Sequence, residues 1–523
     1  MAEARVAVVG AGVGGLTAAA VLARSGLDVA VLEAHVLPGG CASTFPYQGY
    51  RFDAGATLAA GFGPGGPMEV VAAAAGVAAW PVRPAEHVMD VHLPDGAVVP
   101  VVAGAGRWAA RLEAFGPDAR AFFTWQERTA DVLWALALGL PPWPVQRPGE
   151  AAGMLGTLWR WGLADPRRLL GPGLLVDAVR PVARRLSGVP ERLRLFVDAQ
   201  LLIAAQVTSE RANALYAAAA LDLPRRGVAH VGGGMGALAE SLARAAESHG
   251  ARVRYRAAVR RITPGRGGRF MLETRRGAVE ADVVLINLPP PDAARLFDQP
   301  RPALGGARRP RDAWGAFVVY AGVDAATTAG EGALHHQVVT GLPLGEGNSV
   351  FASLSPVWDA GRAPAGRRAL TLSTHTRPGR WLRWAETDPG RYEREKQLLT
   401  ERVVAAAERA LPGLVGGCRP LLPGTPVTFA RFTGRETGWV GGYPQTSLAR
   451  ARGPRVGRGL WLVGDSVFPG QSTAAVALGG LRVARAVLDG LAVDRGARRV
   501  AGARIRPEDG RGAAPAAPRG SRA

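Results

Sequence analysis

Short apolar runs followed by glycine turns and helix-like stretches occur near both ends of the chain. The run Val6–Val9 leads into glycines, an apolar stretch to Arg24 and a second run, Val29–Leu32. The run Leu460–Val463 again leads into a glycine turn and an apolar stretch. Strand, glycine turn and helix in this order are typical of a parallel sheet with crossover helices. The pattern predicts an α/β fold whose nucleotide-binding sheet uses both regions.

The middle of the chain adds further pieces of that sheet. The segment GGGMGALAESLARAAESHGARVRY predicts an amphipathic helix and a strand, and ADVVLINLPP predicts a buried parallel strand. We therefore expect a discontinuous Rossmann-like FAD-binding domain and an α+β substrate domain that faces the membrane. The expected boundaries are 1–110, 228–300 and 415–493 for the first domain and 111–227 and 301–414 for the second, with a disordered basic tail at 494–523.

Composition narrows the function without naming it. The 523 residues are 48% hydrophobic and carry a net charge of +20, but arginine is scattered throughout and Lys396 is the only lysine. No nucleic-acid motif accompanies this charge, so we expect no nucleic-acid partner. Cys41 and Cys418 are the only cysteines, which excludes a disulfide framework or a cysteine-built metal site. We expect a cytoplasmic protein without a metal.

Tryptophan and arginine gather in one apolar stretch of the middle. Its tryptophans are Trp125, Trp134, Trp143, Trp159 and Trp161, and its arginines are Arg167, Arg168, Arg180, Arg184 and Arg185. Such a stretch suits a membrane interface, and it equally suits a helical cap packed on its own domain. Because no run of about 18 apolar residues occurs, any membrane contact is expected to be peripheral.

The first glycine turn has the spacing of a dinucleotide-binding fingerprint. Gly10, Gly12 and Gly15 form GxGxxG, in which the glycines allow a tight turn, approach of a pyrophosphate and close helix packing. The helix that starts at Gly14 would direct its N-terminus at the phosphates. Glu33 ends the second strand, where its carboxylate can accept hydrogen bonds from ribose hydroxyls and would repel the 2′-phosphate of NADP.

The far segment GLWLVGDSVFPGQSTAAVALGGLRVARAVL favours FAD over NAD. Its strand leads to Gly464 and Asp465, then to a glycine-containing turn and an apolar helix. This arrangement can place a carboxylate at the ribityl hydroxyls and a helix N-terminus near the flavin ring. Asp465 could alternatively act as a structural N-cap.

The chain resembles the FAD-dependent carotenoid desaturases and isomerases related to bacterial phytoene desaturase. The resemblance rests on LEAHVLPGGCASTF, YRFDAGAT, GGGMGALAESLA, TPVTFARFTGRETGWVGG and LVGDSVFPGQSTAAVALGG. Within that family, SVFASLSPVWDAGRAPAGRRALTLSTHT and WGAFVVYAGV look most like the hydroxycarotenoid 3,4-desaturases. The resemblance implies an oxidoreductase with FAD that acts on a carotenoid and passes electrons to oxygen or a quinone.

The resemblance also implies a set of FAD contacts. It places Gly10, Gly12 and Gly15 at the pyrophosphate, Glu33 at the adenosine ribose, Val259 at the adenine, and Gly464 and Asp465 at the ribityl chain. The complete expected set is Gly10, Gly12, Gly14, Gly15, Glu33, Ala34, Gly40, Ser43, Gly55, Ala56, Val259, Gly464 and Asp465. Many relatives carry arginine where Cys41 stands, so the pyrophosphate either lacks a charged contact here or receives one from another arginine. Cys41 is expected to be a small packed residue rather than a covalent flavin anchor.

The expected reaction needs little from side chains. Hydride passes from the substrate to flavin N5 while a proton leaves the adjacent carbon, and the polyene delocalises the developing cation. Candidate polar helpers are His335, His336, Arg435 and Glu436, the histidines because they adjoin an apolar strand and the other two because they precede the flavin segment. A structural histidine, or an ion pair of Glu436 with an arginine, would explain them equally well.

Three other functions remain open from sequence. A carotenoid cis–trans isomerase would use the same scaffold without net oxidation. An amine oxidase has no specific feature in this sequence. A carrier of an isoprenoid or a protein would be expected to lose the nucleotide signature, which this chain keeps in its glycines, Glu33 and Asp465.

Overall fold

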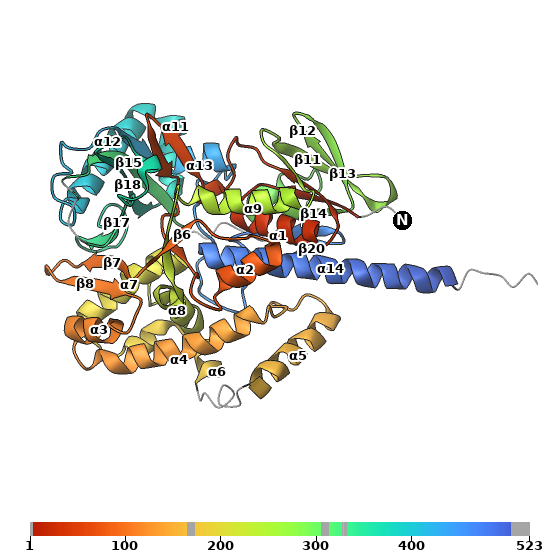
Figure 1. The fold of residues 1–523 in the computed structure, drawn as a ribbon, viewed down its shortest axis with the longest axis horizontal. Coiled ribbons are helices and arrows are strands. Elements are labelled where there is room, and N and C mark those ends of the chain that lie inside the picture. Colours follow the sequence, from red (N-terminus) through yellow and green to blue (C-terminus); the bar gives the residue numbers. More distant parts are fainter. Residues whose placement is uncertain (1–3, 165–172, 305–312, 327, 329–331, 504–523) are drawn as a thin grey trace, which may run out of the picture. The chain divides into compact units, whose positions relative to one another are not determined.

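A six-stranded sheet carries the nucleotide fingerprint in this computed structural model, which describes residues 4–164, 173–304, 313–326, 328 and 332–503. Its strand order is β10(Arg252–Arg254), β2(Asp28–Leu32), β1(Arg5–Val9), β14(Val283–Ile286), β21(Leu460–Leu462) and β20(Arg455–Gly457). All neighbours pair in parallel except β20, which is antiparallel to β21. Strands from three distant parts of the sequence therefore lie side by side (Figure 1).

Helices bury the parallel strands. The helix α1(Val13–Arg24) is apolar on every side, and all its residues except Arg24 are buried, because it packs against both the sheet and α9(Gly236–Ser248). The helix α2(Pro67–Ala75) comes early in the chain, and the short helix α10(Pro290–Ala294) directly follows β14. The last helix, α14(Thr473–Ala503), begins after the second glycine turn. A small antiparallel sheet, β11(Val259–Pro264), β12(Phe270–Thr274) and β13(Gly277–Ala281), interrupts the order between α9 and β14.

A seven-stranded sheet is the second large sheet of the fold. Its strand order is β19(Leu421–Gly424), β15(Gly315–Asp324), β18(Arg367–Thr376), β17(Ser349–Leu354), β16(His335–Val339), β7(His87–His92) and β8(Val98–Val102). One face packs on α12(Pro389–Ala407) through a core that includes Phe317, Leu372 and Val403. The helices α11(Pro378–Thr387) and α13(Pro426–Thr433) complete this region. The strands β7, β8 and β19 come from segments expected to belong to the FAD-binding domain.

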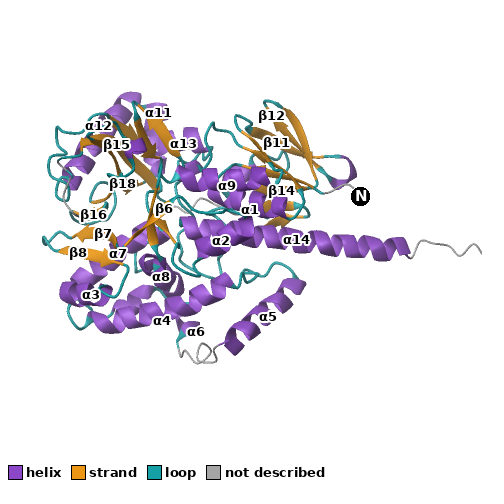
Figure 2. Cartoon of the chain, in the orientation of Figure 1, coloured by secondary structure: helices purple, strands orange, loops and turns teal. Residues whose placement is uncertain are grey.

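Helices from residues 107 to 221 gather below the seven-stranded sheet (Figures 1 and 2). They are α3(Arg107–Phe115), α4(Ala119–Leu138), α5(Pro148–Ala164), α6(Leu174–Asp177), α7(Glu191–Ala205) and α8(Ala214–Leu221). A core of Phe122, Phe196 and Leu201 joins them to β7. Two small sheets connect this region to the first sheet. One pairs β3(Thr44–Tyr47) with β4(Tyr50–Asp53), and the other has the strand order β5(Ala59–Ala60), β9(Val228–Val231), β6(Val82–Ala85).

The chain divides into a unit of residues 1–484 and a short second unit from Arg485. The second unit holds the remainder of α14, which continues to Ala503. Ten residues of the stretch expected to be disordered are thus helical, because the Ala- and Arg-rich sequence has good helix formers. The rest of that tail, and also Arg167 and Arg168, lie outside the described residues.

Candidate functional site

One cavity of about 1250 Å³ runs between the six-stranded sheet and the substrate region. Two groups of its lining residues differ in character. The glycine cradle consists of Gly10, Gly12, Gly14, Gly464 and Asn287, and the substrate-side wall consists of Met89, Leu202, Ile203, Val350 and Phe351. The volume exceeds the range of roughly 300–1,000 Å³ typical of small-molecule sites, as expected for a cavity that holds a dinucleotide and a second molecule.

The glycine cradle is so tight that side chains have no room. A Cβ at Gly12 would lie 2.5 Å from the side-chain amide of Asn287, and one at Gly15 would lie 2.6 Å from the Gly10 carbonyl oxygen. A Cβ at Gly14 would lie 3.2 Å from backbone atoms of Gly464, so the far segment packs at the N-terminus of α1. Unpaired N–H groups at that terminus favour an anion such as a pyrophosphate. Gly15 does not line the cavity and serves close packing.

Asn287 joins the strands of the cradle. It follows β14, its side-chain oxygen accepts a hydrogen bond from the Gly12 N–H at 3.1 Å, and its nitrogen donates to the Val463 carbonyl at 3.2 Å. The amide thereby ties the first glycine turn to the end of β21. No motif surrounds Asn287 in the sequence, so only its position directly after a buried parallel strand signals a role at the site.

Glu33 holds the second turn beside the cradle. Its carboxylate accepts hydrogen bonds from the backbone N–H groups of Ala11 at 2.6 Å and His35 at 2.8 Å. Four lone-pair directions on a carboxylate leave capacity for a further donor such as a ribose hydroxyl. Ala34 lines the cavity next to it, and Val259 lines it from β11. The contact of these residues with the adenosine half of FAD stays a prediction.

A backbone clasp forms the neighbouring wall. The 3-10 helix Gly40–Ala42 ends at Ser43, whose carbonyl accepts a hydrogen bond from the Ala54 N–H at 2.9 Å. The Ala56 N–H donates to the Cys41 carbonyl at 3.0 Å. A Cβ at Gly55 would lie 2.9 Å from that same carbonyl oxygen. The residues of this clasp line the cavity, including Gly40, Ser43, Gly55 and Ala56.

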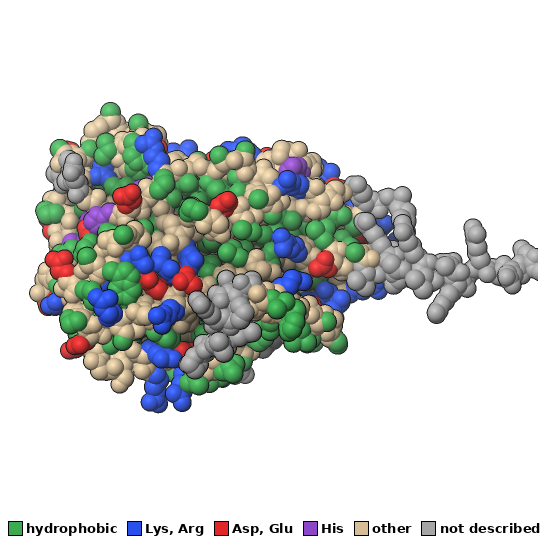
Figure 3. Space-filling model, turned by 60° about the horizontal axis from the view of Figure 1, so that its bottom comes forward, with side chains coloured by type: hydrophobic (Ala, Val, Ile, Leu, Met, Phe, Trp, Pro, Cys, Tyr) green, Lys and Arg blue, Asp and Glu red, His purple; other side chains and the backbone are tan. Residues whose placement is uncertain are grey.

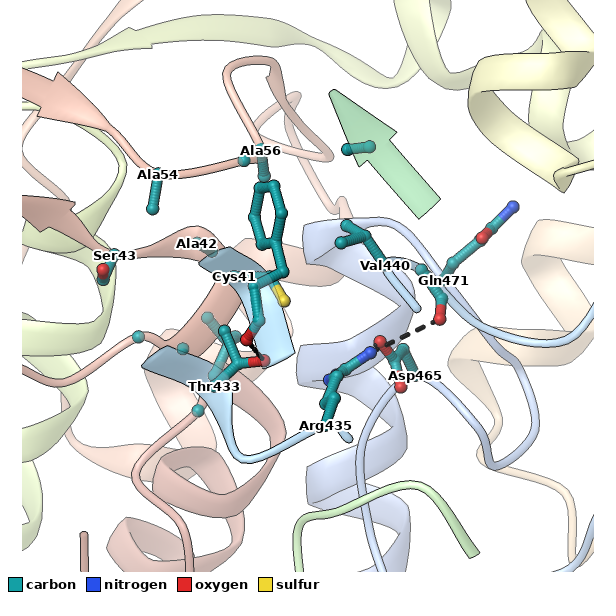
Figure 4. Close-up of a pocket in the computed structure, with 18 of the residues that line it drawn as sticks. Cys41, Ala42, Ser43, Ala54, Ala56, Thr433, Arg435, Val440, Asp465 and Gln471 are labelled. Atoms are coloured by element: carbon teal, nitrogen blue, oxygen red, sulfur yellow. Dashed lines mark hydrogen bonds and ion pairs between the residues drawn. The ribbon is translucent and has the colours of Figure 1, made fainter. Parts of the chain in front are cut away.

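A nearly buried ion pair lines the same cavity as the clasp. A guanidinium nitrogen of Arg435 lies 2.8 Å from a carboxylate oxygen of Asp465, and their side chains are 13% and 16% exposed. Burial opposes the charge on Arg435, yet the Asp465 carboxylate outweighs it and raises the pKa of the guanidinium. Figure 4 shows Arg435 and Asp465 facing each other, with Cys41 on the same space. Arg435 therefore brings an arginine charge to the part of the cavity where Cys41 stands in place of the arginine of many relatives.

Cys41 is half-buried at the cavity, and its surroundings do not activate its thiol. Burial raises the pKa of its thiol, and the Arg435 charge only partly offsets this effect. A protonated thiol is a poor nucleophile. This environment supports the packed role expected for Cys41 over a covalent link to flavin.

Glu436 and Arg435 are sequence neighbours with different surroundings. Glu436 forms an ion pair with Arg295, and each of these two side chains is 54% exposed. Glu436 does not line the cavity, whereas Arg435 does. The ion pair with an arginine, anticipated from sequence as the other explanation of Glu436, is present.

The two candidate histidines are buried behind the cavity wall. His335 shares a hydrogen bond of 2.9 Å with the Ser353 hydroxyl, which donates to the Thr57 hydroxyl at 2.8 Å, and Thr57 lines the cavity. Burial, with His230 and His336 nearby, lowers the pKa of His335 to about 3. His336 bonds instead to His92, 3.2 Å away, and burial lowers its pKa to about 4. Only His335 is linked to the cavity by this chain of hydroxyls.

The substrate-side wall is apolar and draws on distant elements. Met89 comes from β7, Leu202 and Ile203 from α7, and Val350 and Phe351 from β17. The cavity's lining carboxylates are Glu33, Asp292 and Asp465, none of which belongs to this wall. Such a wall suits a long apolar molecule.

The described residues fit FAD at the cradle end. Glycines leave backbone space suited to a pyrophosphate, and Glu33, Val259 and Asp465 line the same cavity. No group of three or more His, Cys, Asp and Glu side chains suited to a metal occurs in the described part of the chain.

Comparison with protein families finds two matches. Residues 178–488 match the flavin containing amine oxidoreductases, and residues 8–74 match the NAD(P)-binding Rossmann-like domain. The chain is 27% identical over 509 residues to the chloroplastic prolycopene isomerase of Daucus carota, covering 93% of this chain and 80% of that protein. It is 28% identical over 526 residues to the hydroxyneurosporene desaturase of Cereibacter sphaeroides, covering 93% and 98%.

Solved structures share the fold. A triple mutant of putrescine oxidase superposes with a TM-score of 0.60 at 16% identity, covering 93% of this chain and 99% of that one. Cyclohexylamine oxidase from Brevibacterium oxydans superposes with a TM-score of 0.57 at 16% identity, covering 94% and 99%.

The expectations on family, fold class and cofactor are confirmed together. The curated relatives are carotenoid isomerases and desaturases, the fold is mixed α/β with a Rossmann-like domain, and the matching family is flavin-containing. With its family match spanning more than half of the sequence, this chain belongs to the flavin containing amine oxidoreductases.

Proposed function

We propose that this flavoenzyme is an FAD-dependent desaturase that introduces a double bond of the C-3′,4′ type into an acyclic carotenoid. The observation that carries the proposal is a single cavity that joins the glycine cradle to a long apolar wall without a carboxylate. An amine substrate would be a cation, and an apolar wall gives it no counter-charge. The hydroxyneurosporene desaturase relative, aligned over 93% of this chain, supports the same reaction class.

The chain's own residues would position the reaction and take up a proton. Bound FAD would supply the oxidation, accepting hydride at N5 from one of two adjacent carbons. The Arg435–Asp465 pair would fix the carboxylate that faces the ribityl chain. Thr57 and Ser353 would offer a route for the released proton toward His335 once both hydroxyls reverse the direction in which they donate. A weak base suffices, because a polyene cation is a strong carbon acid.

Pigment analysis tests the desaturase proposal. The full chain is expressed in a host that makes acyclic carotenoids, and the product is expected to be two hydrogens lighter than the substrate. Anaerobic assays with a quinone supplied or withheld identify oxygen or quinone as the electron acceptor. A protein that binds FAD but leaves every carotenoid unchanged in mass and absorption would overturn the proposal.

Cis–trans isomerisation is the second candidate. The prolycopene isomerase of Daucus carota aligns over 93% of this chain, which is the observation that favours it. Isomerisation would change retention time and absorption while the mass stays constant. A colourless purified protein that refuses added FAD would favour instead a carrier of an isoprenoid or a protein.

An exposed apolar surface is the basis for proposed peripheral contact with an anionic membrane. It comprises Leu155, Trp159 and Leu163 on α5 with Leu175 and Val179 on or next to α6, all at least 62% exposed. Hydrophobic side chains stand beside arginines on the face turned forward in Figure 3. The described helices include none that is long and apolar enough to cross a bilayer. Apolar side chains next to arginine suit the lipid interface.

The tryptophans of this region divide between the two alternatives left open by the sequence. Trp134 is buried, and Trp125 donates a hydrogen bond to the Asp177 carboxylate at 3.0 Å. Trp159 is 69% exposed. Vesicle flotation tests the contact. The W159E variant should lose binding to vesicles rich in phosphatidylserine. Trp134 is a core residue and is not expected to touch the vesicle. Equal flotation of W159E and wild type would refute this surface.

A further inference from the structure

A second hollow, of about 460 Å³, lies on the surface next to the large cavity. We call it the arginine hollow, and its lining residues are Val36, Val253, Arg254, Tyr255, Arg256 and Arg276. Val36 lines both this hollow and the large cavity, so the two spaces are neighbours. The volume lies within the range of roughly 300–1,000 Å³ that is typical of small-molecule sites.

Two turns bring the three arginines of the hollow together. Arg254 ends β10 and Arg256 lies in the turn that follows it, whereas Arg276 lies in the turn between β12 and β13. Val259 at the start of β11 pairs with Thr274 at the end of β12. The second turn is therefore held beside the first by the pairing of β11 with β12.

The arginines of the hollow have no carboxylate partner. Arg252, at the start of the same short strand, forms an ion pair of 2.5 Å with Asp28. Among the described residues, no carboxylate lies within 4.0 Å of the guanidinium groups of Arg254, Arg256 and Arg276, all of which are exposed. Three like charges around one space repel one another, and an anion bound between them would remove that repulsion.

The backbone of Arg256 has a conformation that side chains rarely adopt. Its φ of 55° lies in the left-handed region. The Arg256 N–H donates to the His35 carbonyl at 3.0 Å, and the Arg254 carbonyl accepts a hydrogen bond from the Glu33 N–H at 2.9 Å. Both arginines are thus tied to the loop that carries Glu33. Backbone strain of this kind is concentrated at ligand sites, where the surrounding structure maintains it.

Tyr255 adds an uncharged donor to the hollow. Burial, with the carboxylates of Glu247, Glu33 and Glu240 nearby, raises the pKa of its hydroxyl, which therefore stays protonated. None of these three carboxylates lines the hollow. A guanidinium group keeps its charge and can donate two parallel hydrogen bonds to a phosphate, and a hydroxyl can donate one more. The donors of the hollow therefore match the oxygens of a phosphate group.

We propose that Arg254, Arg256 and Arg276 form a binding site for the phosphate group of a ligand other than FAD. The site lies outside the glycine cradle and the substrate-side wall, so it goes beyond the proposed desaturase function. A soluble phosphate ester and the headgroup of an anionic lipid both carry the group that these arginines recognise. The ligand would lie against the loop of Glu33, on the side away from the glycine turn.

Titration calorimetry of the FAD-loaded full chain with pyrophosphate tests the site. Because FAD fills the glycine cradle, the probe reports on other anion sites. The R254Q and R276Q variants should each bind pyrophosphate about 10-fold more weakly than wild type, since each loses a hydrogen bond between charged groups. R256N should have the same effect, because asparagine tolerates the left-handed conformation and removes only the charge. Flavin absorbance confirms that each variant is folded and loaded.

Arg266 offers a matched control for these substitutions. It is exposed, lies in the turn at the other end of the β11–β12 pair and does not line the hollow. R266Q removes the same charge and should bind pyrophosphate as wild type does. Undetectable binding to wild type overturns the site. Equal weakening in R254Q and R266Q also overturns it, because only the overall charge would then matter.

Vesicles that contain phosphatidic acid identify the source of the phosphate. Flotation that is lost in R254Q and kept in R266Q, together with the pyrophosphate result, would assign the site to a lipid headgroup. Flotation that is equal in these two variants, with pyrophosphate binding weakened only in R254Q, would assign it to a soluble phosphate ester. Both outcomes support a phosphate site in the arginine hollow.

Discussion

The glycine cradle and the substrate-side wall share a cavity but are specified in different ways. The cradle is defined by backbone atoms in close contact, such as the Gly10 carbonyl 2.6 Å from the Cβ position of Gly15. The wall is defined by apolar side chains of three elements, β7, α7 and β17. A backbone site tolerates almost no change, whereas an apolar wall tolerates changes that conserve volume. The cofactor end should therefore be fixed and the substrate end adaptable.

The largest effect should come from displacing Gly10, the first glycine of the cradle, by a side chain at Gly15, which packs against it without lining the cavity. In G15V, the new side chain meets the Gly10 carbonyl, which belongs to the backbone and cannot rotate away. FAD affinity should fall about 100-fold or more, equal to about 2.7 kcal/mol. Fluorescence titration of the apoprotein with FAD measures it, and circular dichroism monitors the fold.

Gly104 offers a matched control for that substitution. A Cβ there meets nothing within 4 Å. The G104A variant should bind FAD as wild type does. An FAD affinity in folded G15V equal to that of G104A would contradict the steric account of the cradle.

The second effect compares two ion pairs at neighbouring sequence positions. R435A leaves Asp465 without its partner in a nearly buried place and should lower the free energy of unfolding by about 3 kcal/mol. R295A breaks the exposed pair with Glu436 and should cost less than about 1 kcal/mol. Urea unfolding with FAD bound measures both. Equal losses would contradict the difference in burial.

The third effect tests the apolar wall. I203D places a carboxylate among apolar side chains facing the cavity, and a carotenoid cannot compensate its lost hydration. Turnover of a carotenoid should fall about 30-fold, equal to about 2 kcal/mol, while FAD affinity stays unchanged. I203V, which conserves the apolar character, should retain most activity. Loss of FAD in I203D would show that the two ends are not independent.

The same contrast explains what could be predicted from sequence. Gly10, Gly12, Glu33 and Asp465 belong to local patterns whose spacing carries their geometry, so their positions at the cavity followed from sequence. Asn287 stands alone after a strand, without a motif. Gln206, His375 and Gln471 meet only because α7, β18 and the second glycine turn pack together. The spacing of residues along the sequence does not predict contacts between such distant segments.

Assignment of strands to layers was also harder than recognition of the nucleotide fold. The strands β7 and β8 fall within residues 1–110, yet they pair with β16 and with each other in the seven-stranded sheet. The pairing of β7 with β16 joins residues about 250 positions apart, and alternating apolar positions do not reveal such partners. Glu436 illustrates the limit at a single residue: its neighbour Arg435 enters the cavity, and it does not.

The smallest effect concerns the buried histidine behind the wall. The folded-state pKa of His335 is about 3, against 6.5 for the unfolded chain, so below pH 6.5 the unfolded chain binds a proton that the folded chain does not. Stability is therefore full above pH 6.5 and falls by about 1.4 kcal/mol per pH unit for this group as the pH drops toward 4. H335N should have a shallower decline, measured by urea unfolding from pH 7 to 4.

Ser353 provides the control for that decline. S353A removes the hydroxyl partner of His335 but keeps the imidazole. Its stability should fall with acid as steeply as that of wild type. A wild-type slope in H335N would mean that other groups, such as His336 and His375, carry the acid sensitivity.

The position of β21 in the central sheet has a consequence for biogenesis. This strand pairs with β14 and carries Gly464 to within 3.2 Å of the Cβ position of Gly14. Some 450 residues separate the two glycines. Because ribosomes add roughly 5–20 residues per second, the second glycine turn is made roughly 20 to 90 s after the first. During that interval the nascent chain holds half a nucleotide site, and once β14 has been made its edge stays unpaired until β21 follows. Cofactor loading is thus a late event in synthesis, and the exposed strand edge is a natural client surface for chaperones.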